Sequence, residues 1–169
     1  MPFTPFHLGP ALLFGLVLSA AFDLPTLLIA SVIPDLEPFY VVYFHVSGYP
    51  LHGFFHSYLG SSIFALSVIL IVYPLRGLLD RIMAAFHISQ KSSFKKILFT
   101  SFVGVYFHVF LDSFLYEEMK PFYPLQGNPF FNLLSAYSSS VIYGFCILTG
   151  LLAIALYFYR ITKGIIVLD

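Results

Sequence analysis

Side chains able to bind a metal ion recur at four places along an otherwise strongly apolar chain. In order they are His7, Asp35, Glu37, His52, His56, His108 and Asp112. Imidazole and carboxylate ligands suit zinc, and also manganese or iron. The single cysteine, Cys146, excludes a thiolate cluster and an internal disulfide. The set therefore predicts a divalent metal site, zinc being expected first, and favours an open catalytic site over a structural zinc clip.

The spacing of these residues supports a shared site. His52 and His56 are four residues apart, as are His108 and Asp112, so on a helix each pair occupies one face. Two such pairs on neighbouring helices, with a carboxylate such as Asp35 from a third segment, can surround one cation or a pair of cations.

The composition indicates the environment of this site. Apolar residues make up 59% of the 169 residues and charged residues 9%, against about 25% charged in ordinary globular chains. A soluble domain of this size leaves too much surface wet to hide so many apolar side chains. The formal net charge is zero, which gives no electrostatic case for nucleic-acid binding. We therefore expect an integral membrane protein with membrane lipid as its main partner.

Apolar runs predict the elements that position the site. Residues 54–75 and 135–159 satisfy the membrane-spanning length of roughly 20 residues, as does 97–116, although that run contains two of the polar residues. Residues 8–22 and 26–33 are shorter and flank a break at Asp23-Leu-Pro, and 36–46 is expected to continue beyond a kink. The predicted fold is all-α, a polytopic transmembrane bundle of four to five membrane segments, the first two short or kinked, forming one integral-membrane domain over residues 1–169.

Positive charges predict the orientation of the bundle. They gather between two spans and after the last one, at Arg76, Arg81, Lys91, Lys95, Lys96, Arg160 and Lys163. The positive-inside rule places both groups in the cytoplasm. Residues 76–93 are then a cytoplasmic connection with an interfacial amphipathic helix, 117–134 form an outer loop, and the C-terminus is cytoplasmic. This topology brings the metal-binding residues to the extracytoplasmic side of a multi-pass cell-membrane protein.

Each residue also has a plain structural interpretation. His52 and His56 are near an interface, where histidine can snorkel, and Asp35 can simply end a helix. His108 and Asp112 can be a hydrogen-bonded pair between helices. However, an aspartate costs roughly 2.5–3.5 kcal/mol at the bilayer centre on insertion scales, which favours a functional reason for Asp112.

Taken in order, the motifs resemble those of a known family. His7-Leu-Gly-Pro, Pro34-Asp35-Leu-Glu37-Pro, His52-Gly-Phe-Phe-His56-Ser and His108-Val-Phe-Leu-Asp112 are similar to elements of the YdjM-like inner-membrane metal-dependent hydrolases, also described as LexA-binding. The resemblance covers about residues 1–125. It implies that His7, Asp35, His52, His56, His108 and Asp112 are metal-site residues and that Glu37 matches the second acid of the family.

The chain also departs from the family pattern. The family's second aspartate is Glu37, its H-R-G-x-T-H element is one residue shorter here, and Phe55 stands where threonine is expected. The shortened element favours His56 over His52 as a ligand. The His-x-x-x-Asp element is also distantly similar to that of zinc phospholipases C, which points towards phosphoesters.

These observations predict a metal-dependent hydrolase. We expect it to act on a lipid or another amphiphilic ester through a metal-activated water. Asp35, Glu37 or Asp112 is the expected catalytic base where it does not bind the metal. The alternatives are a metal-ion transporter or sensor, which needs a second polar layer along a path, and a scaffold with a structural metal. Nothing in the sequence specifies an oligomeric state.

Overall fold

The computed structural model describes residues 5–131, 133–134, 137–164 and 167–168. Its α-helices are α1 (Leu8–Val17), α2 (Leu24–Ala30), α3 (Leu36–Tyr43), α4 (Tyr58–Ala85), α5 (Phe94–Ser113) and α6 (Ser138–Thr162). Three single turns of 3₁₀-helix accompany them, η1 (Pro5–His7), η2 (Ile33–Asp35) and η3 (Phe54–His56). Two short parallel strands, β1 (Ser89–Gln90) and β2 (Val167–Leu168), pair near the end of the chain.

The predicted all-α membrane bundle is confirmed. Four helical stretches are long and apolar enough to cross a membrane: Leu24–Tyr43, Tyr58–Ala85, Phe94–Ser113 and Ser138–Thr162. The stretch Pro5–Val17 is apolar but shorter, as expected for the first segment. The predicted start of the last span, residue 135, lies outside the described residues, and α6 begins at Ser138.

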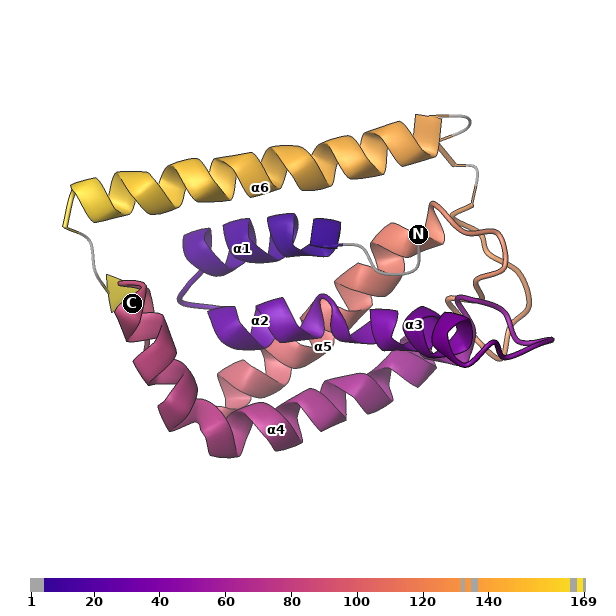
Figure 1. Cartoon of the computed structure of the whole chain (residues 1–169), viewed down its shortest axis with the longest axis horizontal. Coiled ribbons are helices and arrows are strands. Elements are labelled where there is room, and N and C mark those ends of the chain that lie inside the picture. Colours follow the sequence, from indigo (N-terminus) through magenta and orange to yellow (C-terminus); the bar gives the residue numbers. More distant parts are fainter. Residues whose placement is uncertain (1–4, 132, 135–136, 165–166, 169) are drawn as a thin grey trace.

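The break between the first two helices has a local cause. Asp23 adopts an extended conformation and caps α2, and its carboxylate accepts a hydrogen bond from the backbone N–H of Thr26 at 3.2 Å. Pro25 occupies the first turn, where its missing N–H has no helical partner to lose. The chain therefore ends α1 and restarts as α2, which packs against α1, α4 and α5 in the centre of the bundle (Figure 1).

Helix α4 differs from the prediction at both ends. It begins at Tyr58 rather than residue 54, because Ser57 is extended and caps the helix by accepting from the N–H of Gly60 at 3.0 Å. It also continues through Pro74 to Ala85, and the ribbon bends along its length (Figure 1). Within the expected connection 76–93, residues up to 85 thus continue α4, and residues 86–93 link it to α5.

Close helix contacts hold the bundle together at small residues. A Cβ on Gly9 of α1 would lie 2.1 Å from the backbone oxygen of Cys146 in α6. A Cβ on Gly104 of α5 would lie 2.5 Å from the Cβ of Ala30 in α2. Glycine thus permits the approach of α1 to α6 and of α5 to α2.

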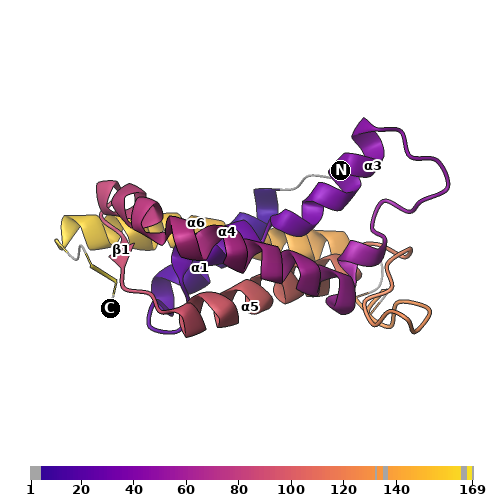
Figure 2. The ribbon, with the colours of Figure 1, turned by 90° about the horizontal axis from the view of Figure 1, so that it is seen from below.

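The irregular segments gather at one end of the bundle. The connections α3–α4 and α5–α6 lie at the same end in two perpendicular views (Figures 1 and 2). The opposite end carries β1, β2 and a buried polar cluster around Asp23, which is fully buried. Nη2 of Arg76 lies 3.0 Å from Oδ1 of Asp23 and 2.9 Å from Oδ1 of Asp80. Asp23 therefore not only caps α2 but also holds α2 and α4 together through Arg76.

Candidate metal centre

Four buried side chains converge at the end of the bundle that carries the irregular connections. Asp35 ends η2, His56 ends η3, and His108 and Asp112 lie one turn apart on α5. One ligand atom from each lies within 4.8 Å of the other three. We call these residues the four-residue group. The sequence predicted all four as metal-site residues, and the structure brings them together.

The distances within the group match those between ligands of one metal ion. Nε2 of His108 lies 3.4 Å from Nε2 of His56 and 3.3 Å from Oδ2 of Asp112. Nε2 of His56 lies 3.8 Å from Oδ2 of Asp112, and Nε2 of His108 lies 3.7 Å from Oδ1 of Asp35. Tetrahedral zinc with bonds of 2.0–2.1 Å separates its ligand atoms by about 3.3–3.4 Å. The ligand atoms of His56, His108 and Asp112 are thus near that spacing, and Asp35 has to move inwards for all four residues to bind one ion.

Partners on the far side of each imidazole set its tautomer. Nδ1 of His108 lies 2.7 Å from the backbone oxygen of Ser31, and Nδ1 of His56 lies 2.7 Å from Oε2 of Glu37. Both oxygens only accept hydrogen bonds, so each Nδ1 carries the proton. In the neutral rings, each Nε2 then presents a lone pair to the centre of the group. Such partners are typical of histidines that bind metals.

The pKa of His56 agrees with this protonation state. Burial lowers its pKa from 6.5 to about 4, although the hydrogen bond to Glu37 opposes the shift. The ring is therefore neutral near pH 7, as a metal ligand must be.

Glu37 holds His56 rather than joining the four-residue group. Its Oε1 accepts hydrogen bonds from the hydroxyl of Tyr49 at 2.7 Å and from the N–H of Phe55 at 3.0 Å. Its Oε2 accepts from the N–H of Gly53 at 3.1 Å as well as from His56. A carboxylate with four donors is a poor proton acceptor, so this geometry favours a positioning role over the predicted catalytic one.

His7 lies directly beside the group. Its Nε2 is 3.0 Å from Oδ1 of Asp112, and its ring centroid is 4.0 Å from that of His108. Its Nδ1 is buried without a hydrogen-bond partner among the described residues. His7 therefore joins the N-terminal segment to the site through Asp112, on the carboxylate oxygen that faces away from the other two histidines.

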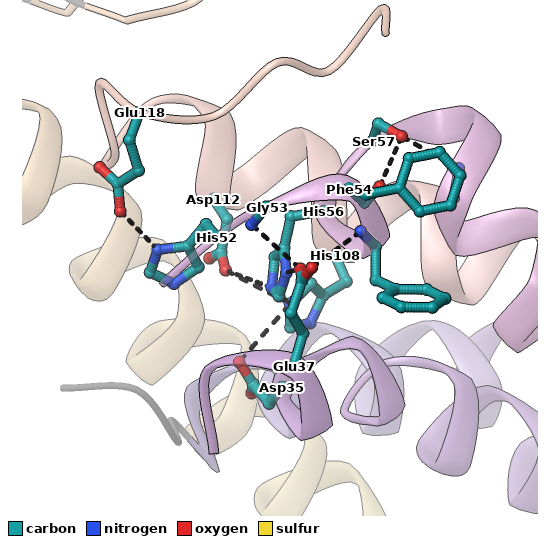
Figure 3. Close-up of polar contacts among 12 residues, drawn as sticks. Asp35, Glu37, His52, Gly53, Phe54, His56, Ser57, His108, Asp112 and Glu118 are labelled. Atoms are coloured by element: carbon teal, nitrogen blue, oxygen red, sulfur yellow. Dashed lines mark hydrogen bonds and ion pairs between the residues drawn. The ribbon is translucent and has the colours of Figure 1, made fainter. Parts of the chain in front are cut away.

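His52, like His7, is a predicted metal-site residue that lies outside the four-residue group. Its Nδ1 lies 2.9 Å from Oε1 of Glu118 (Figure 3). Its ring stacks on Tyr116 with centroids 3.6 Å apart. Its ring centroid is 4.8 Å from that of His56. The two histidines do not share a helix face, because His52 precedes η3 and Ser57 delays the start of α4. This agrees with the expectation that the shortened motif favours His56.

Three partners of the site were not predicted from the sequence. Tyr49, Ser31 and Glu118 contact Glu37, His108 and His52 respectively. A backbone oxygen such as that of Ser31 leaves no signal in residue type. Tyr49 is one of 12 tyrosines, so composition does not distinguish it.

Comparison with known proteins identifies the family. A family model described as YdjM inner membrane protein matches residues 3–167, nearly the whole chain and well beyond the motifs quoted above. Neither the curated proteins nor the solved structures contain a match. The resemblance expected from the sequence motifs is confirmed. The chain belongs to the YdjM inner membrane protein family.

Proposed function

We propose that the chain is a membrane-embedded, metal-dependent hydrolase of a lipid or another amphiphilic ester, phosphoesters included. One observation carries the proposal: the Nε2 atoms of His56 and His108 face each other 3.4 Å apart. Their Nδ1 atoms already donate outwards, to Glu37 and to the backbone oxygen of Ser31, so both Nε2 atoms are left for the centre of the group. A cation between them would bind both nitrogens and would also neutralise the buried carboxylates of Asp35 and Asp112.

The donor set suits zinc first, with manganese or iron as alternatives. When bound, such an ion would lower the pKa of a water ligand to about 7 and so supply hydroxide at neutral pH. His56 and His108 would hold it through their Nε2 atoms. Of the two carboxylates, Asp112 is also held by His7, which makes Asp35 the favoured proton acceptor.

The distribution of positive charge supports an orientation. Arg76 and Lys96 lie near the buried Asp23, at the opposite end of the bundle from the four-residue group. Pairing of β1 with β2 brings the C-terminal segment to that same end. We propose that this end is cytoplasmic and that the four-residue group is near the extracytoplasmic side.

A metal-ion transporter is the second candidate class, and the structure supplies an observation that bears on it. A second buried polar layer lies around Asp23, and a path for metal ions through the bundle would require such a layer. That layer contains Arg76, whose guanidinium already pairs with Asp23 and repels a divalent cation. The layer is therefore better suited to holding helices together than to passing metal ions.

The experiment is a chelator-dependent hydrolysis assay on the purified protein in detergent, over lipid phosphoesters and other amphiphilic esters. We expect activity to disappear with chelator and return with zinc or manganese. Metal content is measured in parallel for wild type, His56→Asn and Asp112→Asn, with the exposed His87→Asn and Glu117→Gln as matched controls. If wild type contains no more metal than His56→Asn and Asp112→Asn, the proposed metal site is contradicted. Metal-loaded protein that is inert on every ester contradicts the hydrolase.

A further inference from the structure

Two cavities lie beside partners of the four-residue group, and the smaller one is lined by more polar groups than the larger. An apolar cavity of about 550 Å³ lies between α3, α4 and the loop that joins them, lined among others by Leu36, Tyr40, Val46 and Phe64. A polar cavity of about 310 Å³ is lined among others by His52, Glu118, Lys120 and Tyr123. Volumes of this order are typical of small-molecule sites. Tyr49 lines both cavities.

Each cavity touches the site through a residue that contacts His56. Glu37 lines the apolar cavity and hydrogen-bonds His56 at 2.7 Å. His52 lines the polar cavity, and its ring centroid is 4.8 Å from that of His56. A molecule that occupies both cavities therefore contacts Glu37 and His52, the two residues that lie against His56.

The apolar cavity lies where lipid can enter. Its α3 and α4 walls belong to the candidate spans Leu24–Tyr43 and Tyr58–Ala85. Leu36 and Tyr40, on its α3 wall, are 48% and 55% exposed. Once these spans are in a bilayer, such surfaces face hydrocarbon rather than water, so an acyl chain is the occupant that their chemistry fits.

The polar cavity carries a cation without a partner. Lys120 forms no ion pair with any residue in the part of the chain that the structure describes, whereas Glu118 pairs with His52. Lys120 is also the single lysine or arginine in the long stretch from 97 to 159. A cation here complements the phosphate of a lipid headgroup.

We propose that the two cavities together bind an anionic phospholipid, with one acyl chain in the apolar cavity and the phosphate beside Lys120. The ester region then crosses Tyr49 and lies between His52 and Glu37, the two residues that contact His56. The claim that this lipid is hydrolysed rests on the proposed function: anionic phospholipids are then the substrate class of the hydrolase. Binding energy from the chain and the headgroup, both remote from the reacting bond, is then available to orient that bond.

The test measures binding, so that it does not depend on hydrolysis. The protein, treated with chelator, is reconstituted in nanodiscs with phosphatidylglycerol that carries a photoactivatable group in one acyl chain, and labelled peptides are mapped by mass spectrometry. We expect labelling concentrated on the peptides containing residues 36–49 and 55–64. Phosphatidylcholine with the same chain should label these peptides about fivefold less, since one basic residue contributes roughly that much to anionic lipid binding.

Matched variants separate the two cavities. Val46→Trp fills the apolar cavity and should abolish the concentrated labelling, while Leu70→Trp, on the exposed face of α4 away from both cavities, should preserve it. Lys120→Gln should remove the preference for phosphatidylglycerol, and Lys163→Gln should keep it. Metal content of each variant, measured after reloading, verifies that it is folded.

Three outcomes overturn the inference. Labelling spread evenly over the lipid-facing surfaces of α4 and α6 means that neither cavity holds a chain. Labelling that is unchanged in both Val46→Trp and Lys120→Gln also means that neither cavity holds the lipid. Displacement by soluble glycerol phosphate at the concentration of the lipid indicates a site for free phosphate esters rather than for lipid. If specific labelling is found while the hydrolysis assay is negative, the lipid site stands and the hydrolase proposal fails.

Discussion

Oε2 of Glu37 lies 2.7 Å from Nδ1 of His56, and both side chains are buried. This contact separates the two acids of the Pro34-Asp35-Leu-Glu37 element by role. Asp35 ends η2 and belongs to the four-residue group, whereas Glu37 lies outside the group and contacts it through His56, as Figure 3 shows. Carboxylates that accept from a metal-binding histidine fix its orientation and raise its basicity.

The first prediction concerns Glu37→Gln. The amide offers one acceptor oxygen in place of two, so it cannot satisfy the four donors that Glu37 satisfies, and His56 loses its fixed orientation. We expect metal affinity to fall by about 10–100-fold, as is typical for such outer partners. Competition with a chelating dye measures it. Glu117→Gln, an exposed change of the same chemistry, is the control, and equal affinities in the two variants would show that Glu37 does not position His56.

Much of the fold followed from the sequence because apolar runs and breakers act locally. Asp23-Leu-Pro predicts the end of one helix and the start of the next, and the structure confirms it through the Asp23 cap. The course of α4 was harder to predict. The predicted span ends at residue 75, yet the helix bends and continues to Ala85, and the guanidinium of Arg76 pairs with Asp23 and Asp80.

The site was predictable in part for the same reason. His108 and Asp112 are four apart on a regular helix, so their shared face follows from spacing. His52 and His56 have the same spacing, but a 3₁₀ turn and the Ser57 cap intervene, and spacing gives no sign of these. The roles of Glu37 and Tyr49 depend on a loop that folds back on α3, which is long-range information.

The second prediction distinguishes the two histidines beside the group. His7 contacts Asp112 directly, whereas His52 pairs with Glu118 and stacks on Tyr116. We expect His7→Gln to weaken metal binding by about tenfold or more and His52→Gln to leave it unchanged. Isothermal titration of metal-free protein measures both. Loss of metal in His52→Gln equal to that in His56→Asn would make His52 a ligand after all.

The third prediction concerns the pH dependence of stability. Burial lowers the pKa of His56 to about 4 in the folded protein, while the unfolded chain keeps a value of about 6.5. Between these values the unfolded chain binds a proton that the folded protein does not, so the free energy of unfolding falls as the pH drops from 6.5 to 4. Above 6.5 this contribution is constant, and below 4 it levels off.

Thermal unfolding of metal-free protein in detergent tests this expectation. The Tm of wild type should decrease from pH 6.5 to 4, and that of His56→Gln should decrease less, because glutamine does not titrate. The exposed His87→Gln should follow wild type. If His56→Gln shows the same decrease as wild type, His56 is not the group that links protons to folding.

The last prediction concerns Gly9, two residues after His7 in the first motif. A methyl group here would lie 2.1 Å from the backbone oxygen of Cys146 and 3.0 Å from the backbone nitrogen of Gly150, so α1 and α6 must move apart. Backbone atoms cannot yield as a flexible side chain does, and overpacking of this kind typically costs about 1–3 kcal/mol. We expect Gly9→Ala to lower the Tm in detergent and, by shifting η1, to weaken metal binding through His7. Gly144→Ala on α6, where a Cβ meets no atom within 4 Å, is the matched control and should retain both properties. A Gly9→Ala protein with the Tm and metal affinity of that control would mean that α1 does not depend on this close approach to α6.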